Sequence, residues 1–118
     1  MMNALMNSND NVEVLLETSR RINSRAVSLI RCLILALIAY SVDDGLQYRE
    51  LKSALNVSDG KLIANLNRLL KMGYIYRQQV RLDRRQLNIF TLTDEGKKEL
   101  ETIMRWIESF QRVAILDA

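Results

Sequence analysis

The chain has 118 residues, of which 48% are hydrophobic and 26% charged, so it is expected to form one globular domain that needs no disulfide or metal ion to fold. It contains no histidine, no proline and a single cysteine, which excludes hydrolases of the Ser–His–Asp and Cys–His kinds and cysteine-rich metal sites. The GxxxxGK and GxGxxG patterns of nucleotide-binding loops are also missing. We therefore expect neither an enzyme nor a protein that holds a cofactor or a metal ion.

The net charge of +3 is unevenly distributed along the chain. Residues 1–44 carry a net charge of −1 and residues 91–118 one of −2, whereas residues 45–90, with nine Lys and Arg and three acids, carry +6. A basic middle segment between mildly acidic ends is typical of a surface that binds nucleic acid. A solvated basic face, or one that binds membranes or acidic proteins, would show the same pattern, so these alternatives stay open at this point.

The first third of the chain bears on the cellular location of the protein. Residues 1–13 lack the basic and apolar regions of a secretory signal, so we expect a cytoplasmic protein, with residues 1–10 forming a flexible N-terminus. The nine consecutive apolar residues from Cys32 to Tyr40 are too few to cross a bilayer, so we expect a buried helix and no membrane segment. Cys32 is expected to be a core thiol rather than a redox sensor, because burial raises the pKa of a thiol.

Two helices are predicted in this part of the chain. Asp10 and Glu13 have the spacing of a capping box, and apolar residues follow at helical spacing, which predicts an amphipathic helix over residues 11–22. Ser24 is expected to cap a second helix that runs to about Ser41 and is apolar on nearly all sides. The turn-forming sequence DDG ends it. Such a helix must be covered on more than one face.

A short helix, a tight turn and a longer helix are predicted next. Residues 46–48 can form a very short strand, and a helix of two or three turns follows. Asn56 is expected at the turn, because asparagine tolerates the left-handed conformation, and Ser58 is expected to cap a helix over residues 58–73. This longer helix carries one apolar stripe, formed by Leu62, Leu66 and Leu69. The order of these elements predicts a helix-turn-helix.

A hairpin and a long last helix are predicted for the rest of the chain. Two β-prone segments, residues 74–82 and 87–93, are separated by the four polar residues 83–86, which predicts a β-hairpin with a type I turn at its tip. Thr93 is expected to cap a helix over residues 94–115.

A helix-turn-helix followed by a two-stranded hairpin is the order of elements in a winged helix. Residues 46–100 resemble winged-helix transcription regulators of the MarR and ArsR type, most of all a compact group in archaea and bacteria. The matching pieces are VSDG (57–60), LLKMGYI (69–75) and LTDEGKKEL (92–100). The sequence departs from the family at Asn56, where glycine is frequent, and at the wing tip, which has neither glycine nor proline.

The resemblance implies a mainly α-helical α+β fold with a small β-hairpin, in a single winged-helix domain over residues 11–118. Residues 11–41 and 94–115 would be its dimerisation helices, and residues 46–93 its helix-turn-helix and wing. The resemblance also implies a prokaryotic, homodimeric, sequence-specific regulator that binds double-stranded DNA. Its recognition helix would lie in the major groove, and its wing on the minor groove or the backbone.

The recognition helix and the wing supply the candidate DNA contacts. Opposite the leucine stripe lie small residues that let the helix approach the groove floor, and polar residues that can donate to bases or phosphates or pair with adenine. Arginines at the wing tip and along its arm would reach the minor groove or the backbone. The candidates are Ser58, Gly60, Lys61, Ala64, Asn65, Arg68, Lys71, Arg77, Arg81, Arg84 and Arg85. Polar outer faces and solvated arginines are common, so it is their combination in one motif that favours DNA.

The second and the last predicted helices carry more apolar surface than one chain can cover. When the last helix is plotted at 100° per residue, its apolar side spans about 200°, roughly twice the arc that a single core needs. We therefore expect a homodimer joined through these helices. The candidate interface residues are Leu33, Ile34, Leu37, Ile103, Trp106, Ile107, Phe110 and Val113.

Two other functions remain as alternatives. The same fold can serve as a protein-interaction module of a larger assembly, because fold alone does not fix function. A small enzyme or ligand-binding protein is disfavoured by the missing histidine and nucleotide loops. No polar cluster indicates an effector site, so the existence of a small-molecule effector stays open, as do the operator and the direction of regulation.

Overall fold

The computed structural model of the protein describes residues 10–41 and 45–116. The predicted flexible start falls outside these ranges except for Asp10, which is already the first residue of a helix. Asp43 and Asp44, in the turn predicted after the second helix, also lie outside the described residues.

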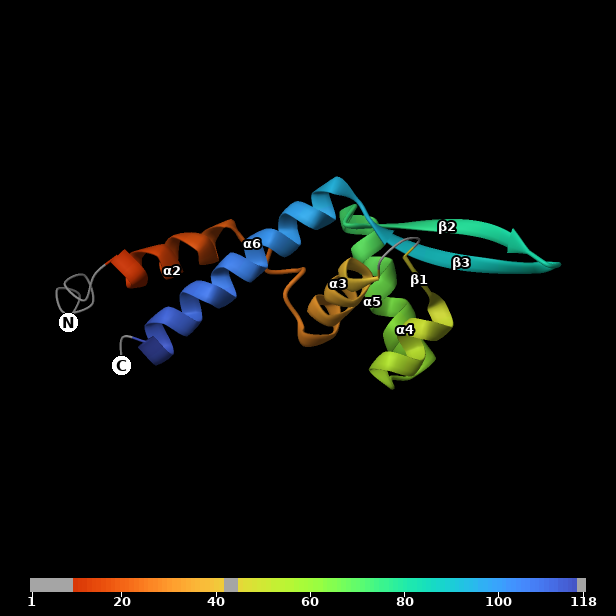
Figure 1. Ribbon diagram of the computed structural model, residues 1–118, viewed down its shortest axis with the longest axis horizontal. Helices are drawn as coiled ribbons and strands as arrows, with labels where there is room; N and C mark the ends of the chain where they lie inside the picture. Colours follow the sequence, from red (N-terminus) through yellow and green to blue (C-terminus); the bar gives the residue numbers. More distant parts are fainter. Residues whose placement is uncertain (1–9, 42–44, 117–118) are drawn as a thin grey trace.

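The described part of the chain contains five α-helices and a three-stranded antiparallel sheet. Figure 1 shows how they are arranged. In chain order the elements are α2 (Asp10–Arg21), α3 (Leu29–Tyr40), β1 (Leu46–Gln47), α4 (Tyr48–Leu55), α5 (Asp59–Met72), β2 (Ile75–Leu82), β3 (Arg85–Leu92), α6 (Asp94–Gln111) and the π-helical turn η1 (Arg112–Leu116). The strand order in the sheet is β1-β3-β2. The fold is mainly helical α+β, as predicted.

The molecule is elongated, with extents of 64 × 26 × 23 Å. α2 and α6 run side by side and form one end, the β2–β3 hairpin forms the other, and α3, α4 and α5 lie between them (Figure 1). Both described ends of the chain lie at the helical end, so the helix-turn-helix and the hairpin are presented at the far side of the molecule.

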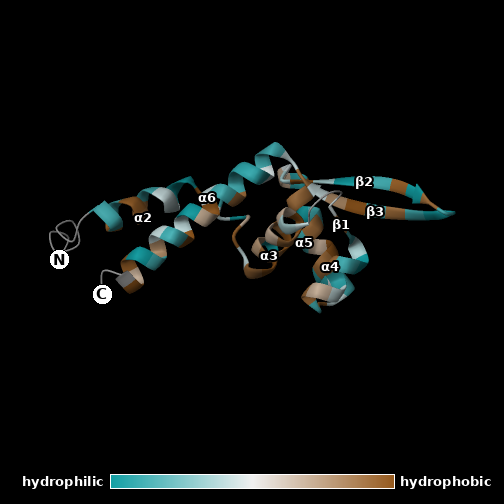
Figure 2. Cartoon of the chain, viewed as in Figure 1, coloured by the Kyte–Doolittle hydropathy of each residue, from teal (hydrophilic) through white to brown (hydrophobic). Residues whose placement is uncertain are grey.

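One hydrophobic core joins α3, α4 and α5 to the base of the sheet and to the middle of α6. Apolar residues gather on α3 and on α5 in the middle of the molecule, and polar residues cover much of α6 (Figure 2). The buried core residues are Ile34, Leu35, Ile38, Leu51, Leu62, Leu66, Leu69, Ile75, Phe90 and Ile103. The predicted leucine stripe of α5 is therefore confirmed.

Local signals set the boundaries of the helix-turn-helix as predicted. Asn56 ends α4 in the left-handed conformation, with φ 53°. The Ser58 hydroxyl accepts a hydrogen bond from the Lys61 backbone N–H at 3.2 Å, which caps α5, and Gly73 ends that helix with φ 79°. The Thr93 hydroxyl caps α6 in the same way, by accepting from the Gly96 N–H at 3.0 Å.

The prediction that Ser24 caps the second helix is wrong. α3 begins at Leu29, and its cap is Ser28, whose hydroxyl accepts from the Arg31 N–H at 3.2 Å. The preceding segment is instead held by tertiary hydrogen bonds around Asn23. Its backbone N–H donates to the Glu99 carboxylate of α6 at 3.0 Å, and its side-chain Nδ2 donates to the hydroxyl of Tyr74 at 3.0 Å. These long-range bonds hold the segment in a turn that its sequence does not reveal.

The predicted type I turn over residues 83–86 is also wrong. Leu82 pairs directly with Arg85, so only Asp83 and Arg84 form the loop, with φ 48° and 68°. Two consecutive left-handed residues make a type I′ turn, whose twist matches that of the two strands it connects. The correction moves Arg85 from the turn into β3.

Two residues predicted for a dimer interface, Ile34 and Ile103, are enclosed in the core of their own chain, 0% and 2% exposed. They cannot contact a partner, so this part of the interface prediction is wrong. Plotting the helix at 100° per residue shows that its apolar side is wider than one core needs. The plot does not show which of these apolar residues pack inside their own chain. Exposed apolar residues remain elsewhere on the same two helices, among them Leu33 on α3 and Ile107 and Phe110 on α6.

The start of α6 packs closely on the backbone of Tyr74, in the connection between α5 and β2. A methyl group added to Gly96 would overlap the backbone carbonyl of Tyr74, which cannot move without shifting β2. We expect Gly96→Ala to lower the free energy of unfolding by about 1 to 3 kcal/mol or more. Gly60→Ala is the matched control, since that site has open space around it, and it should be neutral or slightly stabilising. Denaturant unfolding followed by circular dichroism measures both, and equal stabilities would contradict the packing.

Candidate nucleic-acid interface

The outer face of α5 is open to solvent. Its inward leucines anchor it to the core, and six of the seven residues predicted to contact DNA from this region are exposed: Ser58, Gly60, Lys61, Ala64, Arg68 and Lys71. Gly60 and Ala64 have small or no side chains, so another surface can come close to the helix backbone there. The cations Lys61 and Arg68 lie seven residues apart, about two helical turns, and therefore on the same side of the helix.

Asn65, the seventh candidate, differs from the others because both ends of its amide are already bonded. Its Nδ2 donates to the Lys61 carbonyl oxygen at 2.8 Å, and its Oδ1 accepts from Arg31 Nη1 at 2.8 Å. The side chain is half-buried on the flank of α5. Asn65 can therefore pair with an adenine only after both bonds break, and in this structure it connects α5 to α3.

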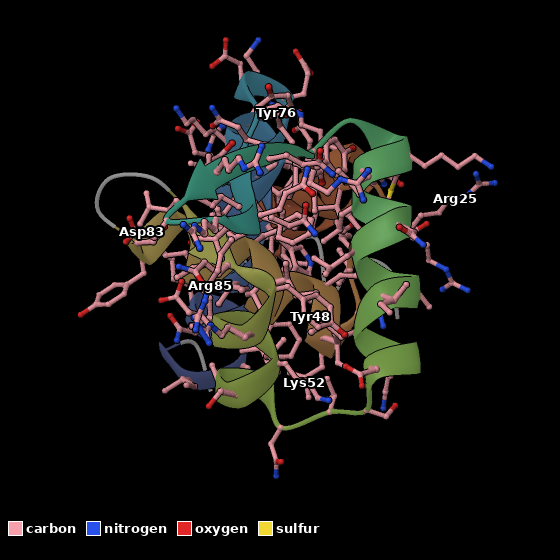
Figure 3. The ribbon with its side chains drawn as sticks, turned by 90° about the vertical axis from the view of Figure 1, so that its right-hand side faces the viewer. Arg25, Tyr48, Lys52, Tyr76, Asp83 and Arg85 are labelled. Atoms are coloured by element: carbon pink, nitrogen blue, oxygen red, sulfur yellow. The ribbon has the colours of Figure 1, made fainter. Side chains whose placement is uncertain are left out.

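A polar cluster fixes the angle between α4 and the first turn of α5. Asp59 accepts a hydrogen bond from the Tyr48 hydroxyl at 2.6 Å and forms an ion pair with Lys52 Nζ at 2.9 Å. Figure 3 shows Tyr48 and Lys52 together at the foot of the two helices. The bonds from Lys52 and Tyr48 lower the pKa of Asp59, and the bond to Asp59 raises the pKa of the Tyr48 hydroxyl. Asp59 thus links α4 to the first turn of α5 at the surface of the helix-turn-helix.

The wing carries arginines on both of its faces. Because side chains alternate along a strand, Arg77 and Arg81 share the face of β2 that carries the buried Ile75. These two arginines therefore lie on the face of the hairpin that faces the helices, with Arg77 near its base opposite Phe90 and Arg81 near its tip opposite Gln86. Arg85 lies on the opposite face and Arg84 in the turn at the tip. All four are exposed.

Two cations near α5 are not predicted from the sequence. Arg25 and Arg31 belong to a segment that has more acids than bases, so its net charge hides them. The fold places both beside the C-terminal half of α5, close to Arg68 and Lys71. Only the packing of α3 against α5 could reveal this, because no local motif joins residues so far apart in sequence.

The sequence comparison identifies the fold family. A family model described as winged helix DNA-binding domain matches residues 30–111, which run from α3 to the end of α6. The chain belongs to this family. Within the winged helix, α5 is the recognition helix and the β2–β3 hairpin is the wing. The matched range does not include α2.

Solved structures of other proteins have a similar fold. YusO from Bacillus subtilis aligns over 99% of this chain and 77% of its own, with a TM-score of 0.70 and 20% identity. A DNA complex of MepR from S. aureus aligns over 88% and 83%, with a TM-score of 0.68 and 19% identity. A MarR transcriptional regulator from Methanosarcina mazei Go1 aligns over 83% and 69%, with a TM-score of 0.61 and 22% identity. The sequence matches none of the curated proteins compared with it.

The sequence predicts that the apolar segment from Cys32 to Tyr40 is a buried helix that does not cross a membrane and that holds a core thiol. In the part of the chain that the structure describes, no helix is both long enough and apolar enough to span a membrane. Cys32 is half-buried beside the core, and this burial raises the pKa of its thiol, as predicted.

Proposed function

We propose that the protein is a homodimeric transcription regulator that binds double-stranded DNA sequence-specifically, with α5 in the major groove and the wing on the minor groove or the backbone. The observation that carries the proposal is a set of exposed cations that form no ion pair within the described residues: Lys61, Arg68, Lys71, Arg77, Arg81, Arg84 and Arg85. Unpaired cations keep their full charge for phosphate groups. The shared fold of the MepR–DNA complex supports DNA as the partner.

The shape of the chain supports the homodimer. Its radius of gyration is 17.5 Å, whereas a compact domain of this length has one of about 13.5 Å. The excess comes from the wing and from the α2–α6 end, where no residue of α2 is buried. A helix without a buried residue, such as α2, gains most of its stability from packing against another surface.

The uncovered side of α6 indicates where the partner would pack. α2 lies against the side of α6 that carries the buried Ser109, with Arg105 and Arg112 at its edge. The apolar side of α6 is left open, with Met104, Ile107 and Phe110 at 59%, 44% and 51% exposure. A two-fold dimer would bury this side and set two recognition helices about 34 to 36 Å apart, so the operator would be a pseudo-palindrome. A cytoplasmic, prokaryotic setting stays a prediction from the sequence.

The salt dependence of duplex binding tests the proposal. If each protomer engages three or four phosphates, the slope of log K against log salt should be about −5 to −7, because each neutralised phosphate releases about 0.9 counterion. Fluorescence anisotropy with a labelled duplex between about 50 and 200 mM salt would measure it. A slope shallower than about −2, or negligible binding at low salt, would refute DNA binding and favour a protein-interaction module.

A further inference from the structure

An open hollow of about 480 Å³ lies beside the C-terminal half of the recognition helix. Side chains from the α2–α3 connection, from α3 and from α5 line it: Arg25, Arg31, Arg68, Lys71 and Met72. Four of the five are cations and none is an acid. No ion pair between these cations and a carboxylate occurs in the described ranges. The hollow therefore concentrates positive charge that the described chain does not balance.

Two arginines of the hollow, Arg25 and Arg31, keep N–H donors that form no hydrogen bond within the described ranges. Arg31 is held against α5 by its Nη1 bond to Asn65, while its buried Nε has no hydrogen-bond partner within residues 10–41 and 45–116. A guanidinium carries five N–H donors in a planar fork, so Arg31 keeps donors for a ligand after it has bonded Asn65. Arg25 is exposed and projects outward beside the C-terminal half of α5, as Figure 3 shows.

We propose that this hollow binds one phosphate group of the DNA backbone in each protomer. The inference rests on the DNA-binding function proposed above and deepens it. The major groove is about 12 Å wide and a helix with its side chains about 10 to 12 Å across, so the sugar–phosphate strands pass close to both flanks of a helix in the groove. Arg25 and Arg31 lie along one such flank of α5, beside Asn65 and Arg68 and C-terminal to Lys61.

A backbone phosphate fits the chemistry of the hollow. Arginine binds phosphate oxygens through paired, charge-assisted hydrogen bonds, and the cluster supplies two arginines from outside the helix-turn-helix. Arg68 and Lys71 belong both to the hollow and to the exposed side of α5, so the site continues the DNA-facing surface without a break. A contact made by the α2–α3 connection would also tie the dimer-forming end of the chain to the DNA.

Arg25→Ala tests the site, because Arg25 is exposed and only its backbone N–H, which alanine retains, is hydrogen-bonded within the described ranges, so the fold should tolerate the change. We expect the salt slope of duplex binding to become shallower by about 1 per protomer, with about a fivefold to tenfold loss of affinity per protomer at about 0.1 M salt. Arg20→Ala is the matched control, since it removes one exposed arginine from α2, and it should leave the slope unchanged.

A duplex with a neutral methylphosphonate at single backbone positions locates the contact. In a bound operator selected from random sequence, one position per half-site should weaken binding of the wild-type protein more than that of Arg25→Ala, which has already lost one of the cations at that phosphate. If the wild type binds duplex and Arg25→Ala behaves like Arg20→Ala, the phosphate site is refuted while DNA binding stands. If the wild type itself fails to bind duplex, both proposals fall.

Inorganic phosphate distinguishes the backbone from a free anion as the source of the phosphate group. Thermal unfolding in millimolar phosphate and in chloride of equal ionic strength should give the same midpoint, because one free phosphate lacks the other contacts of a duplex. A phosphate-dependent rise in the midpoint that Arg25→Ala removes, together with unchanged duplex binding by that variant, would overturn the proposal in favour of a free-anion site.

Discussion

Phe110→Glu is expected to convert the protein from a dimer into a monomer and to abolish its sequence-specific binding of DNA. Phe110 lies on the open apolar side of α6, where it packs against Trp106 with ring centroids 5.7 Å apart and remains 51% exposed. A carboxylate placed in an apolar interface without a partner costs several kcal/mol, and a two-fold interface would contain two of them. Light scattering at micromolar concentration should show the mass fall from twice 13.7 kDa to 13.7 kDa.

The loss of DNA specificity follows from the loss of the second half-site. A monomer would read one half-site, so the ratio of specific to non-specific affinity should fall from about 10³ or more toward 1. Lys98→Glu is the control, since it also adds a glutamate to α6 but on a side chain that is 73% exposed, and it should remain dimeric. A monomeric wild type would refute the dimer. A dimeric Phe110→Glu would move the interface elsewhere, and the exposed Leu29 and Leu33 of α3 would become the next surface to test.

The sequence predicts those elements whose signals are local. Asn56, Ser58 and Thr93 each satisfy backbone groups within a few residues of themselves, so the helix ends they set follow from residue type and spacing alone. The inward stripe of α5 is equally local, because helical periodicity places its leucines on one side. These two kinds of signal suffice for the helix-turn-helix and the hairpin, and hence for the order of a winged helix.

What the sequence does not predict depends on contacts between distant segments. Nothing near Asn23 indicates that Glu99 and Tyr74 hold it in a turn, so the sequence prediction starts the helix at Ser24 and misses the true cap, Ser28. The exposed side of a helix is visible in its periodicity, but its neighbours are not. That is why Asn65 looks free to read a base when Arg31 already bonds it.

The turn of the wing also depends on a contact that the sequence does not show, although the residues involved are close together in the chain. Two strands and a polar connection are evident, but the register that pairs Leu82 with Arg85 decides which two residues form the turn. That register also decides which face of the hairpin each arginine occupies, since a shift of one residue would exchange the two faces. The structure thus assigns Arg81 and Arg85 to opposite sides of the wing, and their contributions to binding need not be equal.

Substitutions on the recognition helix and at the wing tip should affect DNA binding in different ways. Lys61→Ala or Arg68→Ala should weaken binding to a selected operator by about 1 to 3 kcal/mol for each base that the side chain no longer reads, and should flatten the base preference at one position per half-site. Arg84→Ala or Arg85→Ala should weaken binding to all duplexes alike and make the salt slope shallower, because tip arginines that touch the backbone neutralise phosphate without reading sequence.

Selection of bound duplexes from a random library, repeated with each variant, separates the two effects. The base preference should change for Lys61→Ala and stay constant for Arg84→Ala, while the salt slope should become shallower for Arg84→Ala. Arg68 can contact either a base or a phosphate, because it lies on the exposed side of α5 and also lines the phosphate hollow. A variant of Arg68 that alters only the salt slope would assign this side chain to the backbone and leave Lys61 as the base-reading cation of the helix. If neither class of variant changed binding, the DNA surface would have to lie elsewhere on the molecule.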